Sequence, residues 1–225
     1  MNLAIIPIKS KSIRIKNKNT KLFMGKPMFL WSVLAAKKSK IFDKIIVSTD
    51  DSKIVKLVTR HNIEVPFIRP KNLANNHVGI LPVIKHAIKK MIKNNNKITN
   101  VCCIFAATPN INYRDLIKAL KILKNKKNDF IFPVTKNKQE LTRSIFFRMG
   151  KMKLLNDKFY KYRSQDLPIT YNDAGQFYFA KVKTWLKAKK IFSEKSNIII
   201  IPKNSSVDIN TNEDWKKAEK IFKKN

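Results

Sequence analysis

Glycine is scarce in this chain. The 225 residues contain only four glycines, and none lies among the first 24 residues. A dinucleotide-binding fingerprint or a P-loop needs several glycines in the loop after the first strand. Both motifs are therefore excluded, and a phosphate group bound near the N-terminus must be held by side chains and by the available backbone amides.

Cysteine is equally rare, since Cys102 and Cys103 are the only two and are adjacent within an apolar run. Neighbouring residues of a strand point to opposite faces, which argues against a disulfide between them. Two buried thiols are typical of a reducing compartment, so we expect a cytoplasmic protein. Pro7 and Lys9 interrupt the only apolar start, and no run approaches 18 apolar residues, so neither a signal peptide nor a membrane partner is expected.

Acidic residues are few: 15 Asp and Glu stand against 48 Lys and Arg, a formal net charge of +33. Such a charge suggests nucleic-acid binding. The lysines, however, run through every segment instead of gathering in one stripe, and no zinc-finger spacing or aromatic RNA-binding motif is present. We therefore expect nonspecific, salt-sensitive adhesion and no specific nucleic-acid partner.

Short apolar runs alternate with helical patterns, which predicts an α/β fold with a mainly parallel sheet. We expect one domain over 1–225. The predicted strands are 3–7, 44–48, 64–67, 100–105, 129–134, 176–181 and 197–201, and the predicted helices are 27–38, 51–60, 80–93, 112–125, 182–191 and 212–223.

The loop after the first predicted strand carries the clearest functional signal. Lys9, Lys11, Arg14 and Lys18 lie in it, together with several hydroxyl and amide side chains. Open α/β sheets bind anionic ligands at the carboxyl end of such a strand. The alternative is an ordinary solvated loop in a lysine-rich protein.

From Ile5 to Asn19 this loop resembles, without a gap, the nucleotide loop of the CMP-sugar synthetases, I-I-P-A-R-G-G-S-K-R-I-P-x-K-N. The matching positions are Pro7, Ser12, Arg14, Ile15, Lys18 and Asn19. The chain departs from the pattern where Lys9 replaces arginine, Ser10 and Lys11 replace the glycine pair, and Ile13 replaces a lysine.

Further segments resemble the same family, in the family's order and across nearly the whole chain. Those at 102–109 and 173–178 resemble the forms of the pseudaminic acid branch. The matching segments are 45–51 (I-I-V-S-T-D-D), 64–70 (E-V-P-F-I-R-P), 102–109 (C-C-I-F-A-A-T-P), 173–178 (D-A-G-Q-F-Y) and 207–211 (V-D-I-N-T).

The resemblance implies a Rossmann-like fold of the nucleotide-diphosphosugar transferase type, with helices on both faces of the sheet. It also implies transfer of CMP from CTP to an acidic nine-carbon 2-keto sugar, with release of pyrophosphate. By position, Lys9, Arg14 and Lys18 would act on the phosphates. Ser12, Asn19 and Arg69 would bind the nucleotide.

Asp208 and Asn210 match the family's paired acids, which hold Mg²⁺. Their alternate spacing places both side chains on one side of an extended segment, and oxygen ligands suit this ion. Asn210 brings no charge, so weaker metal binding is expected. The alternative is simple helix capping by this segment, with Thr211 as the N-cap and Asp214 in the first turn.

Gln165, Asp173 and Gln176 fall where the family binds its sugar, although a polar turn before the strand at 176–181 explains them equally well. Phe105 aligns with a position that contacts cytosine in the family, but its place in an apolar strand favours a core role.

Residues 136–172 interrupt the alternation and contain several aromatic and arginine side chains, among them Arg143. The resemblance implies an extension that crosses to a partner subunit, hence a homodimer. A lid over the site of a monomer is the alternative.

Two other functions stay open at this point. The same reaction could use sialic or legionaminic acid. Alternatively, the chain is an impaired homologue that serves as a binding subunit, as the substitutions at Ile13, Asn210 and the lost glycine pair suggest.

Overall fold

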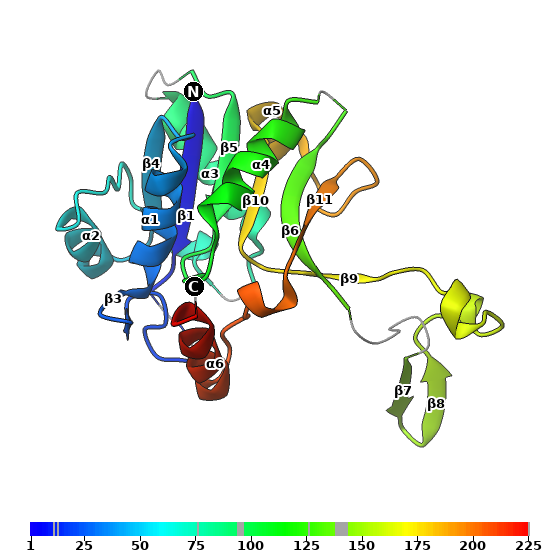
Figure 1. The fold of residues 1–225 in the computed structure, drawn as a ribbon. Coiled ribbons are helices and arrows are strands. Elements are labelled where there is room, and N and C mark those ends of the chain that lie inside the picture. The colour runs from blue at the N-terminus through cyan, green and yellow to red at the C-terminus, as the bar shows by residue number, and fades with distance from the viewer. Residues whose placement is uncertain are drawn as a thin grey trace.

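The computed structural model describes residues 1–10, 12, 14–75, 77–93, 97–125, 127–137 and 144–224. Within them, a seven-stranded sheet has the order β11-β6-β10-β5-β1-β4, and β9 pairs with β6 (Figure 1). The strands of this sheet are β1 (Asn2–Ile8), β4 (Lys44–Thr49), β5 (Asn100–Ile104), β6 (Phe130–Lys136), β9 (Tyr171–Asp173), β10 (Phe177–Lys181) and β11 (Asn197–Ile201).

The sheet is mainly parallel, as predicted. β1 runs parallel to β4 and β5, and β11 runs parallel to β6, whereas β10 is antiparallel to both of its neighbours and β9 is antiparallel to β6. The carboxyl ends of β1, β4 and β5 consequently meet at one edge of the sheet. Ligands of open α/β sheets bind at this edge.

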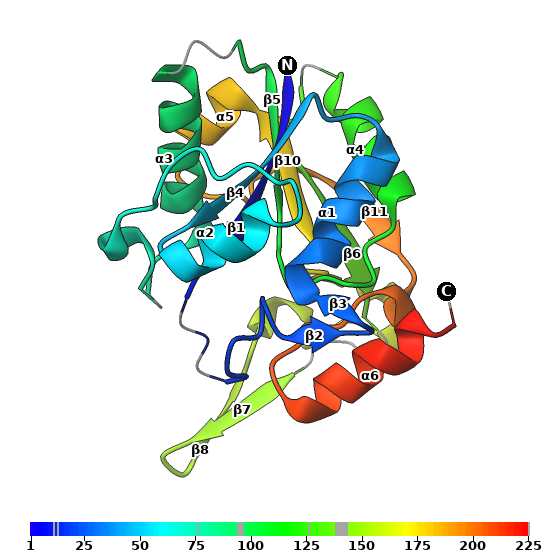
Figure 2. The ribbon, with the colours of Figure 1, turned by 90° about the vertical axis from the view of Figure 1, so that its left-hand side faces the viewer.

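Helices cover both faces of the sheet (Figure 2). Along β1 the side chains alternate: Ala4, Ile6 and Ile8 join one buried cluster, and Leu3 and Ile5 join the other. The first cluster packs against α1 (Met28–Ser39), α2 (Ser52–Thr59) and α4 (Tyr113–Leu123), and the second packs against α3 (Ile80–Lys93) and α5 (Val182–Lys187).

A third, smaller cluster joins the first loop to the last helix, α6 (Asn212–Phe222). The rings of Phe23 and Trp215 meet edge to face at 5.4 Å, and Phe222 packs on Phe23 and on Trp31. Phe23 belongs to a short hairpin of β2 (Leu22–Phe23) and β3 (Lys26–Pro27). This aromatic packing holds the C-terminal helix against the segment that follows the cationic loop.

Two predicted elements differ from the structure. Residues 64–67 form no strand: Glu64 makes an isolated bridge to Ile46, and Ile68, just after this segment, makes another to Thr49. Pro66 lacks an N–H to donate to a ladder, which explains the interruption. The helix predicted over 182–191 ends at Lys187, and Ile191 is buried in the second cluster without being helical.

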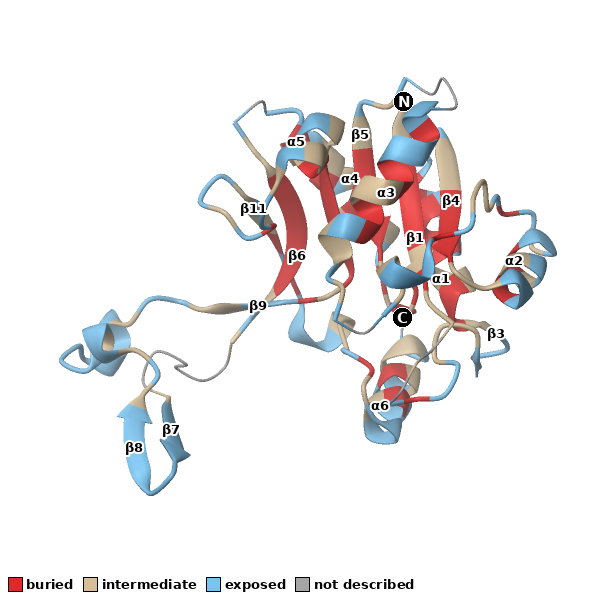
Figure 3. Ribbon diagram, turned by 180° about the vertical axis from the view of Figure 1, so that it is seen from behind, coloured by how far each residue is buried: buried red, intermediate tan, exposed pale blue. Residues whose placement is uncertain are grey.

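The segment 144–170 leaves the sheet as an arm (Figures 1 and 3). It contains the hairpin of β7 (Ile145–Arg148) and β8 (Lys151–Leu154), followed by the 3-10 turns η3 (Asp157–Phe159) and η4 (Ser164–Asp166). The arm extends away from the body of the molecule instead of covering the sheet edge, which does not favour the lid alternative. Arg143 lies outside the described residues.

The arm exposes many large apolar side chains. Phe147 is 74% exposed and Met149 is 90% exposed. Apolar side chains gathered on a surface in this way are characteristic of protein contacts. The dimerisation role of the extension stays a prediction.

Two further 3-10 turns are η1 (Lys71–Leu73) and η5 (Lys203–Ser205). Among the described residues, no helix is long and apolar enough to cross a membrane.

Candidate active site

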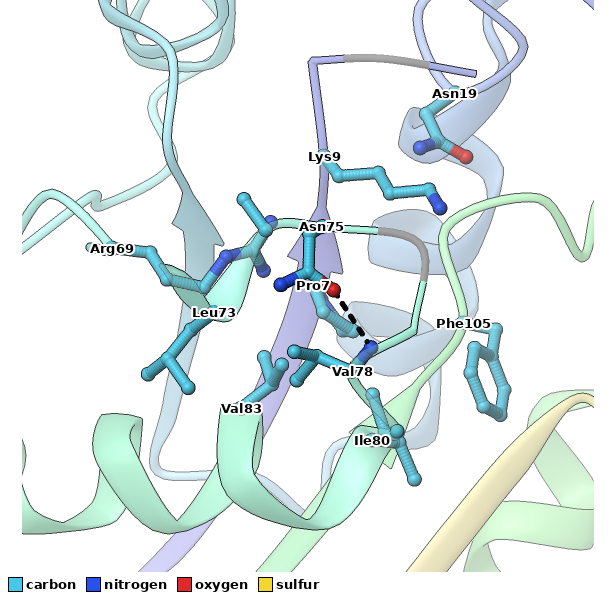
Figure 4. Close-up of a pocket in the computed structure, with 12 residues that line it drawn as sticks. Pro7, Lys9, Asn19, Arg69, Leu73, Asn75, Val78, Ile80, Val83 and Phe105 are labelled. Carbon is cyan, nitrogen blue, oxygen red and sulfur yellow. Dashed lines mark hydrogen bonds between the residues drawn. The ribbon is translucent and has the colours of Figure 1, made fainter. Parts of the chain in front are cut away.

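A cavity of about 230 Å³ lies at the carboxyl end of β1. Figure 4 shows Lys9 extending over it toward Asn19, with Arg69 on one side and Phe105 on the other. Apolar side chains complete its wall, so it combines an apolar surface with a few polar groups, as small-molecule sites do. The lining residues are Pro7, Lys9, Asn19, Arg69, Leu73, Ala74, Asn75, Val78, Gly79, Ile80, Val83 and Phe105.

Asn75 shapes the part of this wall that precedes α3. Its Oδ1 accepts hydrogen bonds from the backbone N–H groups of His77 at 2.9 Å and Val78 at 3.0 Å, and its Nδ2 donates to the carbonyl of Asn72 (Figure 4). The side chain thus holds the loop in a fixed turn. The segment between Leu73 and Val83 was not predicted from the sequence to form a wall of the site.

Phe105 lies in the cavity wall directly after β5. Its ring packs edge to face on that of Tyr178, with centroids 5.5 Å apart. One side of Phe105 therefore belongs to the protein interior and the other faces the cavity. This position is compatible with both interpretations of the residue.

Two other cations of the first loop, Arg14 and Lys9, act on the charge of Lys18. Burial lowers the pKa of the Lys18 ammonium, Asp208 opposes this effect, and the charges of Arg14 and Lys9 lower the pKa further. The Lys18 Nζ donates a 2.6 Å hydrogen bond to the carbonyl of Ile209. The structure therefore brings together all four predicted catalytic residues, three cations and one carboxylate.

The rest of the loop is anchored on the body of the protein. Ile15 is 5% exposed and packs in the third cluster with Ile209 and Trp215. The carbonyl of Asn19 accepts a hydrogen bond from the N–H of Phe29 while its side chain lines the cavity. Ser12 is half-buried within the loop. The substituted positions Lys11 and Ile13 lie outside the described residues.

The predicted metal pair forms an internal hydrogen bond, because Asn210 Nδ2 donates to Asp208 Oδ2 at 2.7 Å. Capping is also present: Thr211 and Asp214 form a capping box, and Asp214 additionally accepts from the N–H of Asn210. These bonds lower the pKa of the Asp214 carboxyl. Capping by Thr211 and Asp214 leaves the Asp208 side chain outside the box, so both interpretations of the segment are compatible.

Asp208 and Asn210 alone offer a small ligand set. Among the described residues, no group of three or more His, Cys, Asp or Glu side chains could hold a metal ion. Mg²⁺ is commonly held by one or two carboxylates, waters and the phosphates of a substrate. The Asp208 carboxylate, which lies near the Lys18 ammonium, therefore fits an ion that arrives with a nucleotide.

The structure places two of the three predicted sugar residues near each other. Asp173 accepts hydrogen bonds from the N–H of Gly175 and from the hydroxyl of Tyr178. Gln176 is 3% exposed, and its Nε2 donates to the carbonyl of Ser205 at 3.2 Å. The amide of Gln176 thus bonds the segment that leads to Asp208, and this burial does not favour direct sugar contact.

Gln165 is separated from the other two. It lies exposed in η4 on the projecting arm (Figure 1). Within one copy of the chain, the structure does not bring it to Asp173 or Gln176.

Arg69 lines the cavity, yet the residue is only 3% exposed and its guanidinium bonds to protein groups. It donates to the carbonyls of Ser48 and Ile8 and to the carboxylate of Asp50. Asp50 was not among the predicted site residues. The signal for it was its position, directly after a predicted parallel strand, where site residues gather.

Comparison with known proteins places the chain in a family. The family described as Cytidylyltransferase matches residues 3–225. The chain is 34% identical to the pseudaminic acid cytidylyltransferase of Campylobacter jejuni over 225 residues, which covers 100% of this chain and 97% of that protein. It is 27% identical to the CMP-N,N'-diacetyllegionaminic acid synthase of Legionella pneumophila, covering 99% and 97% of the two chains.

The fold agrees. A CMP:2-keto-3-deoxy-manno-octonic acid synthetase, solved in complex with CTP, superposes with a TM-score of 0.74 at 12% identity, covering 99% of this chain and 98% of the other. Such low identity bears on the fold alone. The match along nearly the whole sequence carries the assignment, and the chain belongs to the cytidylyltransferase family.

Proposed function

We propose that this protein transfers CMP from CTP to a nonulosonic acid of the pseudaminic acid type. The observation that carries the proposal is that Lys18 lies close enough to Asp208, Arg14 and Lys9 to be affected by their charges, and that Lys9 also lines the cavity. A triphosphate carries several negative charges, and this number of cations is what neutralising it requires. The identity to pseudaminic acid cytidylyltransferases supports the choice of sugar.

The reaction is a phosphoryl substitution. The anomeric hydroxyl oxygen of the sugar bonds to the α-phosphorus of CTP, the bond from that phosphorus to the α,β-bridging oxygen breaks, and the hydroxyl proton is lost. Pyrophosphate leaves with the bridging oxygen. Because little covalent chemistry is required of the protein, catalysis is positioning and electrostatic stabilisation.

Each side chain has a part in this scheme. Lys9 bridges the nucleoside cavity and the phosphates, and Arg14 contributes a second cation. Lys18 stabilises the charge that develops on the leaving pyrophosphate. Ser12 and Asn19 bind the nucleotide, and Arg69 supports the wall of the base and ribose site.

Asp208 would hold Mg²⁺ together with the phosphates, and Asn210 would assist through its amide oxygen after turning from its present bond to Asp208. When bound, the ion neutralises phosphate charge. Its preference for oxygen ligands agrees with this pair.

For the sugar, Asp173 offers a carboxylate to hydroxyl or amide groups, and Gln176 supports the turn beside it. We place Gln165 in the site of a second copy, since its arm projects away from its own sheet. The protein would then act as a homodimer.

The test is pyrophosphate release from CTP and Mg²⁺ with pseudaminic, legionaminic and sialic acids in parallel. We expect release with pseudaminic acid and none without a sugar. CTP should also raise the melting temperature more than ATP, GTP or UTP, because a bound ligand stabilises the native state. Equal shifts with all four nucleotides at about 0.3 M salt, where charges are screened beyond roughly 6 Å, would contradict a cytidine site.

A specific observation supports an alternative, an impaired homologue that binds the nucleotide without turnover. Asn210 replaces a family carboxylate, and its side-chain amide donates a hydrogen bond to the Asp208 carboxylate. CTP-specific stabilisation without pyrophosphate release from any of the three sugars would favour this alternative.

A further inference from the structure

Arg69 and Asp50 form a buried ion pair at the carboxyl ends of β1 and β4. Arg69 Nη2 lies 3.2 Å from Asp50 Oδ1, and the two side chains are 2% and 10% exposed. The same guanidinium donates to the carbonyl of Ile8 at 2.9 Å and to that of Ser48 at 3.2 Å. A buried pair with such additional hydrogen bonds holds both charges in one geometry.

Asp50 uses its remaining acceptor capacity on the first loop. Ser10 donates its backbone N–H to Asp50 Oδ1 at 3.2 Å and its hydroxyl to Asp50 Oδ2 at 2.7 Å. Ser10 directly follows Lys9, whose side chain lines both the nucleoside cavity and a neighbouring one under α2. A continuous set of polar contacts thus runs from Arg69 through Asp50 to the start of the cationic loop.

This contact depends on a residue that departs from the family pattern. Ser10 stands where that pattern has the first glycine of a pair. A glycine has no side chain to bond Asp50, and its backbone has more conformations to lose on ordering. Here the serine hydroxyl supplies a bond that glycine could not make.

We propose that Asp50 and Ser10 are positioning residues that order the phosphate-binding end of the nucleotide site before the ligand arrives. The proposal rests on the proposed function. If the loop is ordered when the protein folds, ligand binding does not have to supply the entropic cost of ordering it. The ordered loop also holds Lys9 where the phosphates will lie.

Because of its location, the Ser10 contact should affect binding of the triphosphate more than binding of the nucleoside. The wall that would face the nucleoside includes Leu73, Val78 and Val83, and Ser10 is not among the residues that line this cavity. Loss of the Ser10 contact should therefore weaken binding of the triphosphate and leave binding of the nucleoside almost unchanged. A general structural defect would weaken both.

The experiment measures Kd for CTP and for cytidine by calorimetry on the full chain. Ser10→Ala removes the hydroxyl bond and leaves the Arg69–Asp50 pair intact. We expect its Kd for CTP to rise about three- to tenfold, the usual effect of one hydrogen bond, with the Kd for cytidine changed less than twofold. Ser10→Thr, which keeps a hydroxyl, should restore binding, and Asp50→Asn should weaken CTP binding more than Ser10→Ala.

The matched control is Asp51→Asn. Asp51 neighbours Asp50, and its side chain caps α2 by accepting from the N–H of Lys53 at 2.7 Å, a role that asparagine fills equally well. We expect CTP binding like the wild type in this variant. If Asp50→Asn fails to fold, Ser10→Ala still decides the outcome.

Equal losses for CTP and cytidine in Ser10→Ala, or no loss for either, would overturn the positioning role while the proposed function stands. Absence of CTP binding by the wild type would instead overturn the proposed function, and this inference with it.

Discussion

The ammonium of Lys18 donates a 2.6 Å hydrogen bond to the carbonyl of Ile209, across 191 positions of the chain. This bond joins the cationic loop after β1 to the segment that precedes α6. Ile15 and Ile209 also pack together in the third cluster, so the contact is supported by apolar burial. The Lys18 ammonium and the Asp208 carboxylate are thereby placed near each other, and their charges interact.

Lys18→Ala should lower kcat far more than it weakens CTP binding, since the ammonium acts on charge that develops in the transition state. Loss of one such contact costs about 3 kcal/mol, on the order of a hundredfold in rate. Steady-state pyrophosphate release measures kcat, and calorimetry measures Kd. Lys16→Ala, an exposed lysine in the same loop, is the control and should behave as the wild type. Turnover like the wild type in Lys18→Ala would remove Lys18 from the mechanism.

The alkaline limb of the pH profile should report Lys18. Burial and the charges of Arg14 and Lys9 lower its pKa, so as the pH rises the active, protonated form should be lost at a lower pH than for an ordinary lysine, whose pKa is about 10.4. Bound phosphate favours the protonated form, so the limb of kcat should lie at higher pH than that of kcat/KM.

The Lys18→Arg variant checks the origin of this limb. Arginine stays protonated over the whole range, so the limb should disappear even if the rate falls. An identical limb in the wild type and in this variant would assign the titration to another group.

Asp208→Ala should abolish Mg²⁺-dependent pyrophosphate release while leaving the fold intact by circular dichroism. Asn210→Asp should lower the Mg²⁺ concentration for half-maximal rate, because hard cations prefer carboxylate oxygens. In metal-free buffer the same variant should melt slightly lower, because two carboxylates then repel each other, and Mg²⁺ should reverse the loss. Equal Mg²⁺ dependence of the wild type and Asn210→Asp would show that the metal pair is assigned wrongly.

Phe147→Asp should shift the protein from dimer to monomer in sedimentation velocity. The side chain is 74% exposed on the arm, so the substitution should leave the melting temperature of the monomer unchanged. Ile92→Asp, at an exposed position of α3, is the control and should leave the sedimentation coefficient as in the wild type. A wild-type protein that sediments as a monomer at micromolar concentration would contradict the homodimer.

Much of the fold was predictable because its signals are local. The continuous apolar run of β1 and the helical spacing in α3 led to predicted elements that agree with the structure almost to the residue. Thr211 and Asp214 identified the start of α6 through their spacing alone, since a capping box involves residues three positions apart. The prediction of a strand at 64–67 was wrong because it followed the apolar residues of this segment and gave too little weight to Pro66.

The candidate site was predictable only in part. The charges of Lys9, Arg14 and Lys18 and the edge of the sheet on which they lie followed from the sequence, because a loop after a parallel strand must reach that edge. The hydrogen-bond and ion-pair partners of the site side chains could not be predicted from the sequence. Gln176, expected at the sugar, is buried against Ser205, and Arg69, expected at the nucleotide, is paired with Asp50.

The sequence by itself therefore determined the order of the elements, the edge that carries the site and the family resemblance, because each depends on residues close together in the chain. The tertiary structure alone decided that Asp50 links Arg69 to Ser10, that Ile209 accepts from Lys18, and that the arm projects outward. The three hydrogen-bond contacts join residues 19, 40 and 191 positions apart. Their distances are set only when the whole sheet and its helices have packed, since hydrogen bonds act over about 3 Å and local patterns carry no such information.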